Sequence, residues 1–173
     1  MDQHDPEGAA PYRVTFVCTG NICRSPIAEV VVRDALGREG LGDRVVVDSA
    51  GTGGWHEGDG ADPRAVAALE AAGLDGTAHR AREVDRSALG TTDLVVALDS
   101  GHARDLRALL PPDRADRVRL LRSFDPDADG TDVADPYYGD DAGFTTTVEQ
   151  VRAAVPGLLA HVRAELDGRV TAP

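Results

Sequence analysis

A short apolar run, Arg13–Val17, passes through a polar loop directly into a helix-like segment, Pro26–Arg38. The run has the β-branched and aromatic residues that favour a strand, and the segment repeats its apolar residues at the three- and four-residue steps of an amphipathic helix. Strand-like and helix-like segments go on alternating along the chain, which predicts a parallel sheet covered by helices on both faces. In such sheets ligands bind beyond the carboxyl ends of the strands, which is where this first loop falls.

The same patterns place the remaining elements. The expected strands are Arg13–Val17, Arg44–Val47, Asp93–Leu98 and Arg117–Leu121. The expected helices are Pro26–Arg38, with Ile27, Val30, Val31 and Ala35 on its buried stripe, then Pro63–Ala72, His102–Leu110 and a long C-terminal helix through Val148–Leu166. Pro156 lies within the last helix and is expected to begin a new turn or to kink it. The sequence therefore predicts a single-domain α/β fold with a four-stranded parallel sheet.

The loop that follows the first strand, residues 18–25, has the residues needed to bind a phosphate group. A loop between a strand and a helix can curl so that its backbone N–H groups converge on a dianion. Cys18 would then lie at the bottom of this cradle as the nucleophile, with its pKa lowered by the helix dipole. Arg24 would hold two phosphate oxygens with its planar guanidinium group. These residues predict a phosphate-binding loop with a reactive thiol.

Three further residues suit a tightly curled loop. Gly20 permits a close backbone approach, and Asn21 tolerates the left-handed region better than most residues. Ser25 is expected either to cap the following helix or to donate a hydrogen bond to the thiolate of Cys18. One hydroxyl group cannot fully serve both roles, and the sequence leaves both open.

This stretch resembles the signature of the low-molecular-weight protein tyrosine phosphatases, Cys-x-Gly-Asn-x-Cys-Arg-Ser-Pro. The resemblance recurs in the family's order along most of the chain, from about residue 12 to residue 167. The matching stretches are Asp48-Ser-Ala-Gly-Thr52, Trp55-His56, Asp62-Pro-Arg64, His79-Arg-Ala-Arg82 and Asp135-Pro-Tyr-Tyr-Gly139. A bare Cys-x5-Arg arises by chance, whereas the full loop together with a distant Asp-Pro-Tyr-Tyr is much more specific.

The resemblance implies hydrolysis of phosphotyrosine through a phosphocysteine intermediate. Cys18 would attack phosphorus, and Arg24 would bind the phosphate and its transition state. Asp135 would be the general acid that protonates the leaving phenolate. Residues 125–141 hold seven aspartates, and only the family's Asp-Pro motif singles out Asp135 among them. Pro136 restricts the backbone before it to extended forms, which would fix the direction of the Asp135 carboxyl group.

The other expected site residues fall into three groups. The phosphate-binding loop comprises Thr19, Gly20, Asn21, Ile22, Cys23, Arg24 and Ser25. Trp55, Tyr137 and Tyr138 would form aromatic walls deep enough to admit phosphotyrosine and exclude phosphoserine. The resemblance assigns Ser49 and His79, together with Asn21, to a scaffold that holds the loop. Cys23 could form a reversible disulfide with Cys18 under oxidants, and neither a metal nor a cofactor is expected.

Composition limits the remaining possibilities. The net charge of −12 argues against a nucleic-acid partner, and no apolar stretch approaches the roughly 20 residues of a membrane span. Both cysteines lie in one loop, so a disulfide-built secreted fold is excluded and a reducing cytoplasm is expected. Met1–Pro11 lacks the apolar segment of a signal peptide and is expected to be a flexible tail before a domain at residues 12–173. The expected partners are tyrosine-phosphorylated proteins, with a cognate tyrosine kinase as a candidate, and inhibitory oxyanions such as phosphate.

Three other readings share parts of this pattern. Related arsenate reductases pass their oxidation to further cysteines, and this chain has only two. Protein-arginine phosphatases also resemble the chain, but they typically have threonine at the position of Ile22 and lack the tyrosine pair after Asp-Pro. A non-catalytic phosphate-binding or thiol-redox module is the alternative from another class. One departure from the phosphatase family, Asp99-Ser-Gly-His102 in place of Asp-x-x-Asn, puts only the local scaffolding of that turn in doubt.

Overall fold

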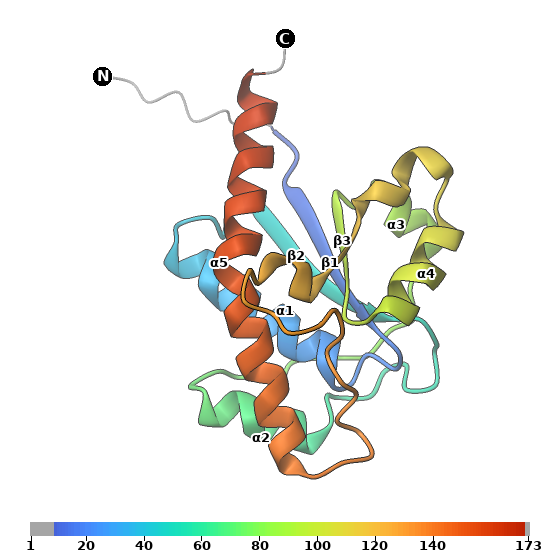
Figure 1. The fold of residues 1–173 in the computed structure, drawn as a ribbon, viewed down its shortest axis with the longest axis vertical. Coiled ribbons are helices and arrows are strands. Elements are labelled where there is room, and N and C mark those ends of the chain that lie inside the picture. The colour runs from blue at the N-terminus through green and yellow to red at the C-terminus, as the bar shows by residue number, and fades with distance from the viewer. Residues whose placement is uncertain (1–8, 172–173) are drawn as a thin grey trace.

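Residues 9–171 are described by the computed structural model, and they form one parallel sheet flanked by helices (Figure 1). The strands are hydrogen-bonded in the order β2-β1-β3-β4. They are β1 (Tyr12–Cys18), β2 (Val45–Gly51), β3 (Leu94–Ala97) and β4 (Val118–Leu120). The α-helices are α1 (Arg24–Arg38), α2 (Pro63–Ala71), α3 (Arg86–Thr91), α4 (Ser100–Leu109) and α5 (Asp141–Thr171), and the 3-10 helices are η1 (Pro112–Arg117) and η2 (Leu121–Phe124). The predicted α/β fold with a four-stranded parallel sheet is confirmed.

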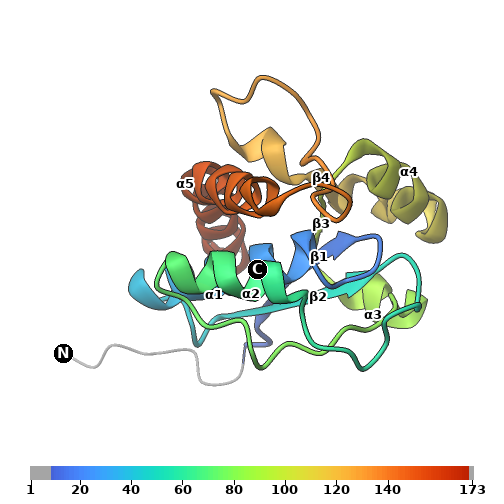
Figure 2. The same cartoon turned by 90° about the horizontal axis from the view of Figure 1, so that it is seen from below.

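Helices cover both faces of the sheet (Figure 2). α1 and α5 pack against each other on one face, whereas α3 and α4 contribute to a separate core on the other. Neighbouring residues of β1 alternate between the two cores, with Phe16 in the larger and Val17 in the smaller. Both faces of β1 are covered, since every residue of the strand except Arg13 is buried, including the polar Thr15.

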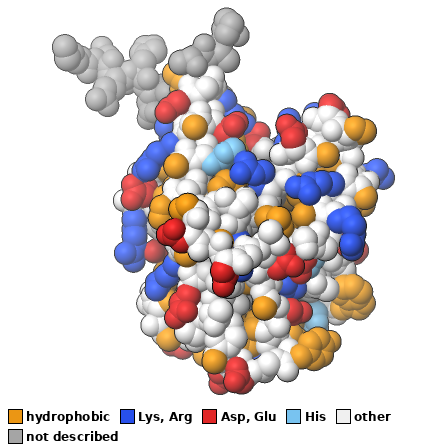
Figure 3. Space-filling view, viewed as in Figure 1, with side chains coloured by type: hydrophobic (Ala, Val, Ile, Leu, Met, Phe, Trp, Pro, Cys, Tyr) orange, Lys and Arg blue, Asp and Glu red, His pale blue; other side chains and the backbone are white. Residues whose placement is uncertain are grey.

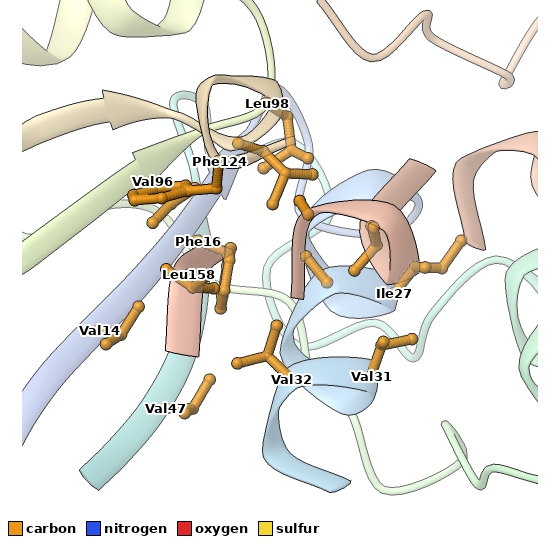
Figure 4. Packing of buried hydrophobic residues seen from close by; sticks show 14 of the residues in the cluster. Val14, Phe16, Ile27, Val31, Val32, Val47, Val96, Leu98, Phe124 and Leu158 are labelled. Atoms are coloured by element: carbon orange, nitrogen blue, oxygen red, sulfur yellow. The ribbon is translucent and has the colours of Figure 1, made fainter. Parts of the chain in front are cut away.

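The larger core lies between the sheet, α1 and α5. Figure 4 shows Phe16 and Leu158 next to each other, with Val32 of α1 on their side of the helix and Ile27 and Val31 to the right of it. The predicted stripe on α1 was only half right, since Ile27 and Val31 are buried but Val30 and Ala35 are only partly so. Val32 and Leu36 are buried in their place. The reason is that α5 covers α1 from a second direction, which widens the buried face beyond one stripe.

Several boundaries differ from those predicted. β2 continues four residues past the expected end at Val47, because Ala50 and Gly51 still pair with the end of β1. This extension places Ser49 within the sheet, beside the loop that follows β1. α4 begins at Ser100, two residues before the expected start, because the carboxylate of Asp99 caps it by accepting from the His102 N–H. α3 was not predicted, since six residues are too few to show a helical period.

α5 runs without interruption from Asp141 to Thr171, and Pro156 lies inside it. α5 remains helical on both sides of the proline, so no separate helix begins there, and the alternative of a kink at Pro156 stays a prediction. Just after it, Gly157 packs directly against the backbone of Phe124 in η2. The absence of a side chain at Gly157 therefore allows α5 to approach η2 closely.

The predicted N-terminal tail lies mostly outside the described residues, which begin at residue 9. Its division from a domain at residues 12–173 stays a prediction. Among residues 9–171, no helix combines the length and the apolar character that crossing a membrane requires. Acidic and basic side chains are interspersed over the face in Figure 3, so the negative net charge does not make this face uniformly acidic.

The contact between α5 and η2 gives a stability prediction. Gly157→Ala should lower the free energy of unfolding by about 1–3 kcal/mol, because the added methyl group would overlap the backbone of Phe124. The matched control is Gly37→Ala in α1, where no atom lies within 4 Å of an added Cβ. This control should raise the free energy of unfolding by up to about 1 kcal/mol through helix propensity. Urea denaturation measures both, and a stabilising Gly157→Ala would contradict the packing described here.

Candidate active site

The loop between β1 and α1 is held by its own carbonyl groups. Cys18 is the last residue of β1, and α1 begins at Arg24. The carbonyls of Thr19, Asn21 and Ile22 accept hydrogen bonds from the Gly53 N–H, His79 Nε2 and the Asp62 N–H. By contrast, the backbone N–H groups of residues 19–24 donate to no acceptor within residues 9–171. A loop whose carbonyls are bonded and whose N–H groups remain available is suited to binding an anion.

Asn21 lies at the centre of this loop. Its φ of 59° is the only positive φ of a non-glycine residue in the described chain, as its expected tolerance of the left-handed region allows. Its side chain is completely buried, and all of its polar atoms are bonded. Nδ2 donates to Ser25 Oγ at 2.8 Å and to Ser49 Oγ at 2.9 Å, while Oδ1 accepts from the Arg82 N–H at 3.0 Å.

The predicted scaffold residues Ser49 and His79 are both in contact with Asn21. His79 Nε2 lies 2.6 Å from the Asn21 carbonyl oxygen, and because that oxygen only accepts, Nε2 carries the proton. Behind the ring, His79 Nδ1 lies 4.0 Å from the carboxylate of Glu29, which is also buried. The structure thus brings the scaffold together behind the loop, outside the residues that line the cleft.

Ser25 contacts the thiol of Cys18 and does not cap the helix. α1 has no side-chain cap, and its N-cap position is Cys23. Ser25 Oγ lies 2.9 Å from Cys18 Sγ. Because the amide of Asn21 can only donate to Ser25 Oγ, the serine hydroxyl keeps its own proton, and the acceptors within reach are Cys18 Sγ and, at 3.5 Å, the Ala50 carbonyl. The capping role left open by the sequence is therefore excluded, and donation to the thiolate of Cys18 stays a prediction.

Arg24 is buried, with 3% of its surface exposed, and its guanidinium group is held from two sides. Nη1 donates to Asp99 Oδ2 at 2.9 Å and to the Val133 carbonyl at 3.0 Å. Nη2 lies 3.4 Å from Thr19 Oγ1 and 3.6 Å from Asp135 Oδ2. A buried charge of this kind must be paired, so Asp99 both neutralises and orients Arg24.

Asp99 and His102 are site residues that the sequence analysis did not assign to the site. His102 is buried, and its Nε2 lies 2.9 Å from Thr19 Oγ1. Its Nδ1 lies 3.1 Å from Asp99 Oδ1 but makes no hydrogen bond in the described part of the chain. Burial lowers the pKa of His102 below its usual range, although the carboxylate of Asp99 opposes this. The sequence did contain a signal for His102, because it stands where the family usually has the Asn of Asp-x-x-Asn. This is the residue that contacts Thr19 of the phosphate loop.

Asp135 approaches the loop from the segment before α5. Its Oδ1 accepts from the Tyr137 N–H at 3.2 Å, and its Oδ2 is the oxygen near Arg24. Its side chain is 42% exposed, so it reaches the site from the solvent side. The structure therefore brings together Cys18, Arg24 and Asp135, the three residues predicted to be catalytic.

One cleft of about 280 Å³ joins these residues to the predicted aromatic walls. It is lined by Cys18, Thr19, Gly20, Ile22, Cys23, Arg24, Trp55, His56, Asp135, Tyr137 and Tyr138. Trp55 and Tyr138 are among the most exposed large apolar residues, at 75% and 91%, and Tyr137 stacks edge-to-face on Tyr138. Figure 3 shows large hydrophobic side chains beside a histidine at the lower right of the molecule. His56 had no predicted role, yet its ring packs against Gly20, where an added Cβ would lie 2.9 Å from its Cδ2.

Comparisons with known proteins identify the family. Residues 13–168 match the family model described as low molecular weight phosphotyrosine protein phosphatase. The chain belongs to this family. It is 57% identical over 161 residues to a low molecular weight protein-tyrosine-phosphatase of Streptomyces coelicolor. The aligned residues make up 91% of this chain and 98% of that protein.

Solved structures give the same result. The fold is similar to the crystal structure of YfkJ from Bacillus subtilis, with a TM-score of 0.85 and 32% identity over 91% of this chain and 98% of that one. It is also similar to a structure of the YwlE arginine phosphatase, with a TM-score of 0.77 and 29% identity over 87% of this chain and 95% of that one. The recognised family and the predicted fold are thus confirmed.

The two thiols of this phosphatase are in different environments. Burial raises the pKa of Cys23 to about 12, with the carboxylate of Asp62 adding to the effect. Cys23 is therefore a protonated thiol at neutral pH and a poor nucleophile. Both cysteines are free, so a disulfide between them stays a prediction. Within residues 9–171, no group of three or more His, Cys, Asp or Glu side chains is arranged to hold a metal ion.

The environment of His102 gives a prediction for the pH dependence of stability. Its pKa is lowered in the folded state, so the unfolded chain binds the proton first as the pH falls below about 6.5. The folded protein should therefore lose stability between neutral pH and about pH 5. His102→Asn removes this group, so the variant should lose less of its free energy of unfolding over that interval. Urea melts at both pH values measure the difference, and parallel losses in the two proteins would contradict it.

Proposed function

We propose that this protein is a protein-tyrosine phosphatase that hydrolyses phosphotyrosine through a phosphocysteine intermediate. The observation that carries the proposal is the cleft in which Cys18, Arg24 and Asp135 meet beneath exposed aromatic side chains. The names of its relatives support the same activity, since the Streptomyces coelicolor relative is named a protein-tyrosine-phosphatase. The roles given below to individual residues are part of the proposal.

In the first step, the phosphate of the substrate would be bound by the N–H groups of residues 19–24 and by Arg24. The Cys18 thiolate, with Ser25 as hydrogen-bond donor, attacks phosphorus, and the bond from phosphorus to the phenolic oxygen breaks. Asp135 gives its proton to that oxygen as it leaves. The products of this step are a free tyrosine side chain and phosphocysteine.

In the second step, water replaces the phenol. The Asp135 carboxylate takes a proton from the attacking water, the sulfur–phosphorus bond breaks, and inorganic phosphate is released. The Cys18 thiolate is then ready for another turnover. Arg24 serves both steps, because the equatorial oxygens carry the charge in each transition state.

The walls of the cleft favour an aromatic ester. Ile22 presents an apolar side chain from the phosphate loop itself, and Trp55, Tyr137 and Tyr138 can contact the faces of a phenyl ring. A phosphoserine side chain is too short to reach these walls and the phosphate loop together. These contacts support phosphotyrosine over phosphoarginine, because a polar guanidinium group would be bound less favourably than a phenyl ring by these apolar side chains.

The wider biological setting follows from the same site. We propose tyrosine-phosphorylated proteins as substrates, a cognate tyrosine kinase as a functional partner, and phosphate and other oxyanions as competitive inhibitors. We also propose that the protein works in the cytoplasm, because its nucleophile must remain a reduced thiol.

The role of Asp135 can be tested by the leaving group. Asp135→Asn should lower kcat by about 10²–10⁴-fold with phenyl phosphate, because phenolate needs protonation to leave. With 2,4-dinitrophenyl phosphate, whose leaving group is stable as an anion, the loss should be much smaller. Steady-state kinetics on both esters measure this, and equal losses on the two would remove Asp135 from the role of general acid.

The proposed substrate class can be tested with three matched peptides. Phosphate release is measured from one sequence carrying phosphotyrosine, phosphoserine or phosphoarginine, and the phosphotyrosine peptide should be the best substrate. Cys18→Ser is the control for contaminating activity, since a serine hydroxyl stays protonated and attacks poorly. A preference for phosphoarginine would favour the activity named for YwlE, and binding without turnover would favour a non-catalytic module.

A further inference from the structure

Arg64 makes an unusual number of contacts near the candidate active site, although it does not line the cleft. It is the second residue of α2, two positions after the N-cap residue Asp62. Its Nε and Nη2 atoms bind the two oxygens of Asp62 at 3.0 Å and 2.9 Å. This pairing lowers the pKa of Asp62 and keeps the carboxylate ionised. The guanidinium group is thereby fixed to the start of α2 in a defined orientation.

The same guanidinium group holds the segment that follows Asp135. Nη2 donates to the Tyr137 carbonyl at 3.0 Å, and Nη1 lies 3.3 Å from the Gly139 carbonyl. Its central carbon lies 5.6 Å from the centre of the Tyr137 ring and 4.6 Å from that of Phe144. Arg64 therefore contacts Tyr137 and Gly139 in the turn at residues 136–139, and Phe144 in the first part of α5.

The turn held by Arg64 sets the position of the Asp135 carboxyl group. The Tyr137 N–H donates to Asp135 Oδ1, while the Tyr137 carbonyl accepts from Arg64. The Gly139 N–H closes the turn onto the Pro136 carbonyl at 3.0 Å. A short run of fixed backbone thus connects the guanidinium group of Arg64 to Asp135.

The other end of the connection reaches the phosphate loop. The Asp62 N–H donates to the Ile22 carbonyl at 2.8 Å, so the residue that anchors Arg64 is itself bonded to the loop that would hold phosphate. Asp62 thus accepts hydrogen bonds from Arg64 with its carboxylate and donates one to Ile22 with its backbone N–H. The side chains of Asp62 and Arg64 therefore connect the Asp135 segment to the phosphate loop, in addition to the direct contact between Arg24 and Asp135.

We propose that Arg64 is a positioning residue that sets Asp135 at its working distance from the phosphate loop. The proposal rests on the proposed phosphatase function. A guanidinium group suits this task because it can bind a carboxylate with one edge, two carbonyls with the remaining N–H groups and an aromatic ring with its face. The ammonium group of lysine offers three donors from one point and cannot make these contacts together.

The test is the dependence of the rate on the leaving group. Arg64→Met keeps an apolar side chain of similar length against Phe144 but removes every hydrogen bond. It should lower kcat with phenyl phosphate by about 10–10²-fold, because misplacement of a catalytic group by about 1 Å has effects of that size. With 2,4-dinitrophenyl phosphate kcat should change little, and Arg64→Lys should recover only part of the loss.

A second measurement separates positioning from general loosening of the fold. In an Asp135→Asn background, Arg64→Met should have almost no further effect on kcat, since both changes act through the same proton transfer. Arg152→Met is the matched control, because Arg152 donates to the Ala72 carbonyl at the opposite end of α2 and does not reach the Asp135 segment. It should leave kcat with phenyl phosphate unchanged.

The outcomes are distinguishable. A loss of rate that is equal for both esters, or that persists in full in the Asp135→Asn background, overturns the positioning role while leaving the phosphatase function standing. Failure of the unmodified protein to hydrolyse either ester overturns the proposed function itself. Circular dichroism melts accompany each variant, and comparing the two esters on one preparation removes any contribution from an unfolded fraction.

Discussion

The buried amide of Asn21 is the interaction on which the site depends. One side chain bonds to two serines and to a backbone N–H of a distant segment, and it does so from a left-handed backbone conformation. An amide can satisfy both demands, because it donates with one end, accepts with the other and tolerates this backbone region. Its bond to Ser25 holds that hydroxyl group 2.9 Å from Cys18 Sγ, so the shape of the loop and the environment of the sulfur have one common cause.

Local electrostatics then work against the net charge of the chain. Arg24 is a buried cation between the carboxylates of Asp99 and Asp135, and free N–H groups line the loop beside it. Because Asp99 neutralises Arg24, the attraction for an anion rests on the N–H groups that would touch it, whereas charges elsewhere in a chain of net charge −12 are screened over a Debye length of about 8 Å. Because Asp99 and the Val133 carbonyl hold one edge of Arg24, the guanidinium group is already oriented in this structure. A group oriented by the fold loses less conformational freedom when it binds a ligand.

The sequence predicted the sheet, its parallel direction and the loop after β1, because apolar period and turn chemistry are local signals. It also identified the residues that meet in the cleft, although Asp135 was chosen through a family motif and not through spacing. It missed the tertiary parts: the wider buried face of α1, the role of Asp99 and His102 behind Arg24, and the contacts of His56 and Arg64. These features depend on contacts between segments that are far apart in the chain, and the one local signal among them was the departure from Asp-x-x-Asn at His102.

The position of Trp55 has a practical consequence. It is the only tryptophan in the chain, it lines the mouth of the cleft, and three quarters of its surface is exposed to solvent. Indole emission responds to the polarity around the ring, and no second indole in this protein contributes a background signal. The molecule therefore contains a built-in optical reporter, so that occupancy of the cleft can be followed in real time without an attached dye.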